Sequence, residues 1–167
     1  MARDRLPSKF AIVLTALHSL SLLACFTSII SSAVSAAQIP EEAVTTTGAF
    51  VASFWTIGED IAEIAALANA RIRRCPAKWL YILELVTAIF CFALPAASSL
   101  GYEAAMYERC RYVSYKDEEK FACRRSAGPM ETAATVAMAG VYLAATIHTI
   151  LFFLTVIQYC VMKRKTT

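Results

Sequence analysis

Glycine and histidine are scarce in this sequence, with five and two of its 167 residues. None of the motifs that signal a zinc site, a phosphate-cradling loop or a hydrolase nucleophile occurs. The net charge of +3 is small and spread over several segments, so it does not indicate nucleic-acid binding. These shortages exclude most soluble enzyme classes. We therefore predict a protein that is not an enzyme and has no cofactor, metal or nucleic-acid partner.

Apolar residues are abundant, at 58% of the chain, whereas an ordinary soluble domain has about 45–50%. They gather in four stretches, at about 10–34, 48–70, 79–100 and 132–162. About 20 helical residues cross the hydrocarbon core of a bilayer, so each stretch is long enough to span it. The sequence therefore predicts an all-α integral membrane protein, a single domain in which four spanning helices form a bundle.

Basic residues predict how this bundle is oriented. They flank the N-terminus, the connection between the second and third spans, and the C-terminus, whereas the first connection has none. Cytoplasmic segments carry the excess of Lys and Arg, so both termini are predicted in the cytoplasm and the 101–131 connection on the other side. That connection holds six of the sixteen basic residues. We expect a multi-pass protein of the plasma membrane or an endomembrane.

The first apolar stretch has a second interpretation. A basic head, an apolar run and the small residues Val34-Ser35-Ala36 before Ala37 also suit a cleaved secretory signal. The run is longer than the roughly 7–15 residues of a signal core, which favours a retained helix. Cleavage would leave three spans and place the new N-terminus outside the cytoplasm.

Four of the six cysteines suggest covalent chemistry. Cys110 and Cys123 lie in the connection that is predicted to face an oxidising compartment, where a disulfide is expected. Two free thiols are the alternative. Cys75 and Cys160 lie beside basic residues at the predicted cytoplasmic boundary. They are candidates for reversible palmitoylation, with unmodified thiols as the alternative.

Acidic residues occur where an apolar span is expected. Glu59, Asp60 and Glu63 share one broad face of the second span. Asp60 lies about 16 Å along the helix from the basic flank at Arg71, near the bilayer midplane. An ionised acid at that depth costs about 2.5–3.5 kcal/mol on insertion scales, so it needs partners in other helices. The predicted intramembrane polar cluster contains His18, Glu59, Asp60, Glu63, Glu84 and His148.

The cluster has two interpretations. Ionisable residues inside a membrane by default indicate a proton relay or a cation site. Alternatively, the carboxyl groups are protonated or hydrogen-bonded and fix the packing of the helices. Their depths allow His18 to meet Glu63 and Glu84 in the cytoplasmic leaflet. They also allow His148 to meet an acid of the second span, and no Lys or Arg lies well inside any span.

The layout and a few local residues resemble a known group. Cys110, then Cys123-Arg124-Arg125, precede an alanine-rich fourth span from Glu131. With four spans and cytoplasmic ends, this arrangement resembles the MARVEL group, most closely its small fungal members. The resemblance implies organisation of membrane domains or vesicle traffic, through helix faces that contact lipids and form homo- or hetero-oligomers.

Two other functions stay open from the sequence. One is a small oligomeric transporter, channel subunit or proton-linked carrier that uses the acids of the second span. The other is an intramembrane enzyme or its accessory subunit, in which His18 or His148 acts beside a carboxylate. Nothing in the sequence names a substrate for such an enzyme.

Overall fold

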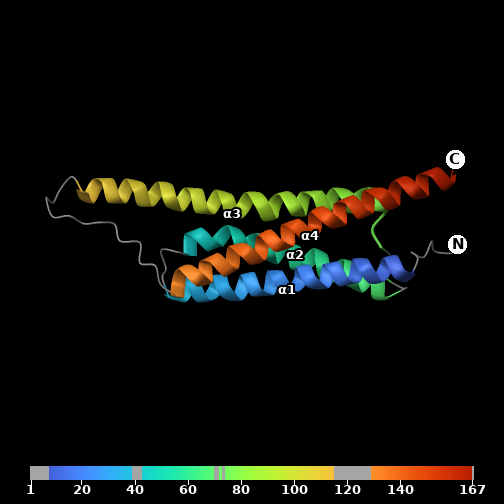
Figure 1. Ribbon diagram of the computed structural model, residues 1–167, viewed down its shortest axis with the longest axis horizontal. Helices are drawn as coiled ribbons and strands as arrows, with labels where there is room; N and C mark the ends of the chain where they lie inside the picture. The colour runs from blue at the N-terminus through green and yellow to red at the C-terminus, as the bar shows by residue number, and fades with distance from the viewer. Residues whose placement is uncertain (1–7, 39–42, 70–71, 73, 115–128, 167) are drawn as a thin grey trace.

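The computed structural model describes residues 8–38, 43–69, 72, 74–114 and 129–166, and it is all-α over these ranges. Its four helices run lengthwise beside one another (Figure 1). The start of α1 and the end of α4 lie at the same end of the bundle, as Figure 1 shows. The helices are α1 (Ser8–Gln38), α2 (Ala43–Ala68), α3 (Ala77–Ser114) and α4 (Pro129–Thr166).

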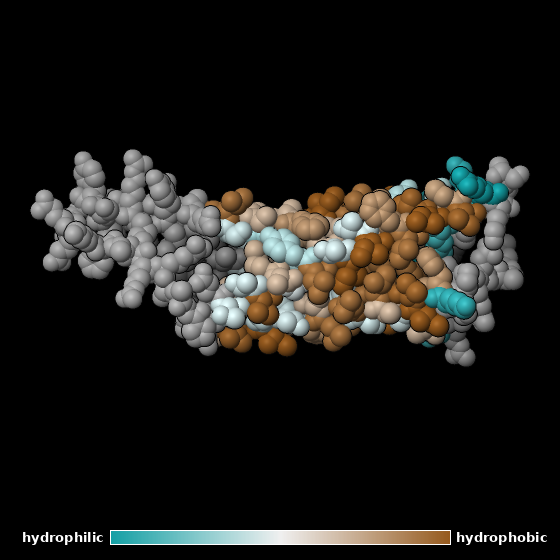
Figure 2. All heavy atoms as spheres, viewed as in Figure 1, coloured by the Kyte–Doolittle hydropathy of each residue, from teal (hydrophilic) through white to brown (hydrophobic). Residues whose placement is uncertain are grey.

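Three of the helices are long and apolar enough to cross a membrane. The stretches are Lys9–Ala37 in α1, Ala77–Leu100 in α3 and Thr132–Val161 in α4. In Figure 2, apolar side chains cover the middle of the visible face, and hydrophilic ones gather at the end where the termini lie. An apolar surface of this extent on a helical bundle is typical of a membrane protein.

The second helix, which is not among these three, carries three buried acids, Glu59, Asp60 and Glu63, but its outer side is apolar. Phe54 and Ile61 are more than half exposed, at 57% and 51%. Asp60, which lies next to Ile61 in sequence, is fully buried. The acidic face of α2 is therefore turned into the bundle.

The third helix continues past the predicted end of its span at residue 100 and reaches Ser114. Seven of the fourteen residues of the added segment are Ala, Glu, Met or Arg, which favour helix. A helix therefore occupies the first part of the predicted 101–131 connection. The predicted disulfide between Cys110 and Cys123 lies outside the described residues, because the structure describes neither the side chain of Cys110 nor any part of Cys123.

Close contacts between helix backbones position the buried side chains. A Cβ atom on Gly48 of α2 would lie 2.2 Å from the Leu94 carbonyl oxygen of α3. On Gly140 of α4 it would lie 2.8 Å from the Ala24 carbonyl oxygen of α1. Small residues allow helices to approach this closely in membrane proteins. The neighbouring core cluster is built from Ala49, Ala52, Cys91, Val141 and Ala145.

Candidate functional site

Four polar side chains, one from each helix, meet in the interior of the bundle. Each is at most 1% exposed. Histidine and carboxylate alternate around the group, which we name the four-residue ring. Its members are His18 of α1, Asp60 of α2, His148 of α4 and Glu84 of α3.

Two short contacts and two longer ones close the ring. The Nδ1 atom of His18 lies 2.8 Å from Oδ1 of Asp60. The Nδ1 atom of His148 lies 2.5 Å from Oε2 of Glu84. The remaining nitrogens make longer contacts, 3.6 Å from His18 Nε2 to Glu84 Oε1 and 3.5 Å from His148 Nε2 to Asp60 Oδ1. Every imidazole nitrogen of the protein therefore faces a carboxylate oxygen.

This geometry constrains where the protons are. A neutral imidazole carries one N–H, so it can donate to only one of its two carboxylates. A histidine of the ring can therefore make a hydrogen bond at both nitrogens in two ways. Either it is an imidazolium, or one of the two facing carboxyl groups is protonated and donates to the imidazole. Two imidazolium ions facing Asp60 and Glu84 would cancel the charge of those carboxylates. The ring is thus able to hold four buried ionisable groups with little net charge.

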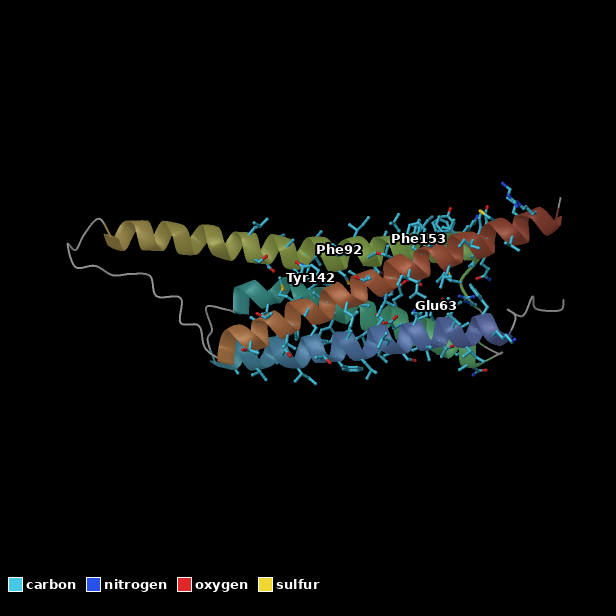
Figure 3. All side chains as sticks on the ribbon, viewed as in Figure 1. Glu63, Phe92, Tyr142 and Phe153 are labelled. Atoms are coloured by element: carbon cyan, nitrogen blue, oxygen red, sulfur yellow. The ribbon has the colours of Figure 1, made fainter. Side chains whose placement is uncertain are left out.

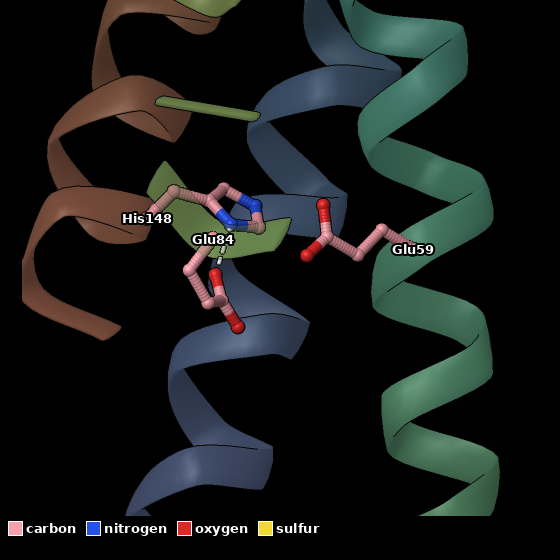
Figure 4. A group of neighbouring side chains, drawn as sticks. All are labelled: Glu59, Glu84 and His148. Carbon is pink, nitrogen blue, oxygen red and sulfur yellow. Dashed lines mark hydrogen bonds and ion pairs between the residues drawn. The ribbon is translucent and has the colours of Figure 1, made fainter. Parts of the chain in front are cut away.

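A third buried acid, Glu59, lies at the edge of the ring. The Thr87 hydroxyl donates to its Oε2 atom, and the Trp55 indole N–H donates to Thr87 over 2.9 Å. Figure 4 shows the Glu59 carboxylate pointing from α2 toward His148 and Glu84. Ligand-type atoms of these three residues lie within 4.8 Å of one another.

Three carboxylate oxygens in this region are buried without a hydrogen-bond partner among the described residues. They are Oε1 of Glu59, Oδ2 of Asp60 and Oε1 of Glu84. An unpaired buried acceptor costs about 1–3 kcal/mol, more when it is charged. Protons on the carboxyl groups or a bound cation would relieve this cost, so the site is chemically open to both.

Glu63, the sixth residue of the predicted cluster, has a different partner. The Arg74 Nε atom donates to its Oε2 atom over 2.9 Å. Arg74 comes from the segment between α2 and α3, and Figure 3 shows Glu63 toward the end of the bundle that holds the termini. The sequence allowed a cluster of Glu63 with His18 and Glu84, and the structure brings only His18 and Glu84 of these three together. Arg74 was not predicted as a partner of Glu63, because its long side chain reaches this acid from outside the helix.

Two hydroxyl residues of the site were missed from the sequence. Ser21 Oγ lies 3.2 Å from His148 Nε2, and Thr87 holds Glu59. Ser21 follows His18 by three residues, and Thr87 follows Glu84 by three. Residues at this spacing share a helix face, so a search for hydroxyls beside the predicted polar residues would have found both.

The two palmitoylation candidates are exposed free thiols. Partial burial, together with the charge of Glu63, raises the pKa of Cys75, while Arg74 acts in the opposite direction. Cys160 lies in the last turns of α4, ahead of Lys163 and Arg164. Their exposure leaves both thiols accessible to modification.

Comparisons with protein-family models, curated proteins and solved structures found no match to this chain. The resemblance to the MARVEL group stays a prediction from layout and a few local residues. The ring and the surface of the bundle are therefore the features that bear on function.

Proposed function

We propose that this chain crosses the membrane four times, with both termini in the cytoplasm, and organises membrane domains or vesicle traffic without catalysing a reaction. The observation that carries the proposal is the ring. It joins all four helices through buried polar contacts. The outward surface is left apolar for contact with lipids and other membrane helices.

The ring supports α2 as a membrane span. A lone helix with Glu59, Asp60 and Glu63 would insert poorly, because each ionised acid costs about 2.5–3.5 kcal/mol near the bilayer centre. Here all three acids are buried. Glu59 and Asp60 contact side chains of other helices, and Glu63 pairs with Arg74 of the segment that follows α2. The polar groups of α2 thus meet protein, and its apolar side is available to meet lipid.

The arrangement of the ends supports the proposed orientation. The start of α1 and the end of α4 lie at one end of the bundle, as an even number of crossings requires. Arg74 lies in the connection between α2 and α3, and Lys78 lies at the start of α3. Lys163 and Arg164 lie in the last turn of α4. The positive-inside rule places such a basic end in the cytoplasm.

The surface supports assembly with other helices. Large apolar side chains project from every helix, and many are about half exposed or more. In a bilayer they contact lipid tails, and helix association then depends on shape and packing. The most exposed among the described residues are Ile12, Leu23 and Ile30 on α1, Phe54 on α2, Trp79, Ile89 and Leu100 on α3, and Phe153 and Ile157 on α4.

The test is the size of the assemblies that the protein forms in a lipid bilayer. Fluorescent protein in supported bilayers should form clusters of several chains, counted by photobleaching steps. Two double variants should be compared. One replaces Phe153 and Ile157 on the outside of α4 with alanine, and the other replaces Ile12 and Leu23 on the outside of α1 with alanine. At least one pair should reduce cluster size with helix content unchanged. Monomers at every protein density would contradict the proposal.

A second candidate function is a small proton-linked carrier or channel subunit, probed by proton and cation flux in liposomes. The unpaired oxygens of Glu59, Asp60 and Glu84 favour it, because they leave buried sites that a proton or cation can occupy. Flux in the unaltered protein that is lost in a folded double variant, Glu59→Gln with Asp60→Asn, would support a carrier. The absence of flux in both would leave membrane organisation as the function.

A further inference from the structure

We propose that Glu59, Glu84 and His148 bind one divalent transition-metal ion inside the bundle. The three side chains come from α2, α3 and α4, and all are buried. Their ligand-type atoms already lie within 4.8 Å of one another. This site is independent of the proposed function, because a membrane organiser and a carrier could each contain it.

The spacing is close to what a metal requires. Nitrogen and oxygen ligands lie about 2.0–2.2 Å from zinc, so ligand atoms around a tetrahedral ion are about 3.3 Å apart. The Glu84 carboxylate, now 2.5 Å from His148 Nδ1, would have to move away from that nitrogen, and Glu59 would have to move inward, each by about 1 Å. Figure 4 shows both carboxylates beside the His148 ring.

The ring orients His148 for metal binding. Its Nε2 atom lies 3.2 Å from Ser21 Oγ and 3.5 Å from Asp60 Oδ1, so this nitrogen can carry the proton and donate it to one of these two oxygens. The Nδ1 atom, 2.5 Å from Glu84 Oε2, then offers its lone pair to the ion. A histidine ligand whose second nitrogen donates to a carboxylate is the usual arrangement at protein metal sites. Asp60 is in turn fixed by His18.

Unpaired oxygens point to a missing ligand. Oε1 of Glu59 and Oε1 of Glu84 are buried without a hydrogen-bond partner among the side chains that the structure describes. Thr87 holds the other oxygen of Glu59 and so fixes its carboxylate. Glu84 Oε1 has the 3.6 Å contact with His18 Nε2, so a cation between these residues would give both oxygens a closer partner.

Charge balance favours a divalent ion. Glu59, Asp60 and Glu84 together carry three negative charges when ionised. Two imidazolium ions would leave one negative charge buried, which is unfavourable in a low-dielectric interior. A divalent ion bound to neutral His148, together with a protonated His18, balances all three. One imidazole with two carboxylates suits Zn²⁺, Mn²⁺ or Fe²⁺ better than Ca²⁺ or Mg²⁺.

The first experiment loads the full-length protein with Zn²⁺ in lipid nanodiscs after treatment with a chelator. We expect one tightly held ion for each chain. X-ray absorption should show only nitrogen and oxygen at about 2.0–2.2 Å, including one imidazole. Sulfur at about 2.3 Å would assign the ion to the cysteines and overturn the proposal. So would the absence of tight binding.

The second experiment compares Glu59→Gln with Glu63→Gln. Both are buried acids on α2, but Glu63 pairs with Arg74 outside the site. Glu59→Gln should weaken Zn²⁺ binding at least tenfold, whereas Glu63→Gln should change it less than twofold. Equal affinity in folded Glu59→Gln and the unaltered protein would contradict the site.

Thr87→Val provides a second variant if Glu59→Gln does not fold. It removes the hydroxyl that fixes Glu59 but keeps every ligand. Loss of a contact that orients a metal ligand should weaken binding about 10–100-fold. Unchanged binding in folded Thr87→Val would overturn the proposed role of Glu59. Normal clustering in bilayers without zinc binding would reject the metal site and leave the proposed function standing.

Discussion

His148 Nδ1 lies 2.5 Å from Oε2 of Glu84 and joins the fourth helix to the third in the buried interior. The same imidazole faces Asp60 of the second helix through its other nitrogen. That nitrogen also lies 3.2 Å from Ser21 Oγ of the first helix, so this one side chain joins all four helices. This makes His148 the most sensitive position of the ring.

Replacing His148 with alanine should destabilise the bundle strongly. Asp60 and Glu84 would lose a donor while staying buried, and breaking such a buried pair costs about 3–5 kcal/mol. The free energy of unfolding, measured in detergent with a denaturant, should fall by about that amount. Thr146→Ala is the control, because Thr146 is exposed on the same helix and its hydroxyl donates only to the Tyr142 carbonyl of its own helix. Equal stability of the two variants would contradict the ring.

The Glu63–Arg74 pair should be energetically coupled. Arg74→Gln leaves the buried carboxylate of Glu63 without its donor, which should cost about 1–3 kcal/mol. Adding Glu63→Gln should recover part of this loss, because no unpaired charge remains. A double-mutant cycle in the unfolding free energy measures the coupling. Additive effects would show that Arg74 does not support Glu63 in the membrane.

Two glycines of α2 should respond oppositely to alanine. A Cβ at Gly48 would lie 2.2 Å from a backbone oxygen of α3 and 2.7 Å from Ser98 Oγ. Gly48→Ala should therefore force the helices apart and cost about 1–3 kcal/mol. Gly58 has no atom within 4 Å of the added Cβ. Gly58→Ala should be neutral or stabilising by up to about 1 kcal/mol, because alanine favours helix. Thermal unfolding of both variants checks the contact.

Cys75 tests the orientation. As the only cysteine retained, it should react with an impermeant maleimide only from the cytoplasmic side. Its thiolate is the reactive form, and its raised pKa means that labelling should keep accelerating as the pH rises to about 9. Glu63→Gln removes a negative charge that raises this pKa, so labelling at neutral pH should become faster. Labelling from the opposite side would reverse the proposed topology.

The sequence predicted four helices, because an apolar run that enters lipid must satisfy its backbone hydrogen bonds within one helix. It did not predict that the third helix continues to Ser114. It also selected the members of the ring, since ionisable residues stand out in such runs. It could not predict which acid meets which histidine. That choice depends on the rotation of each helix, which close contacts such as Gly140 against Ala24 fix. The partner of Glu63 was missed because depth was judged from the backbone, whereas an arginine side chain reaches several ångströms.

The most direct test of the ring is a solid-state NMR measurement in lipid bilayers. The chain has only two histidines, so ¹⁵N-labelled imidazoles give spectra that can be assigned with one variant. Together with ¹³C-labelled carboxylates, they should show dipolar couplings from His148 to Glu84 and from His18 to Asp60. We predict couplings of the strength expected for a hydrogen bond at both histidines. The His148 coupling should disappear in Glu84→Ala, and the His18 coupling should disappear in Asp60→Ala. Histidines with no carboxylate coupling would contradict the ring and the four-helix arrangement built around it.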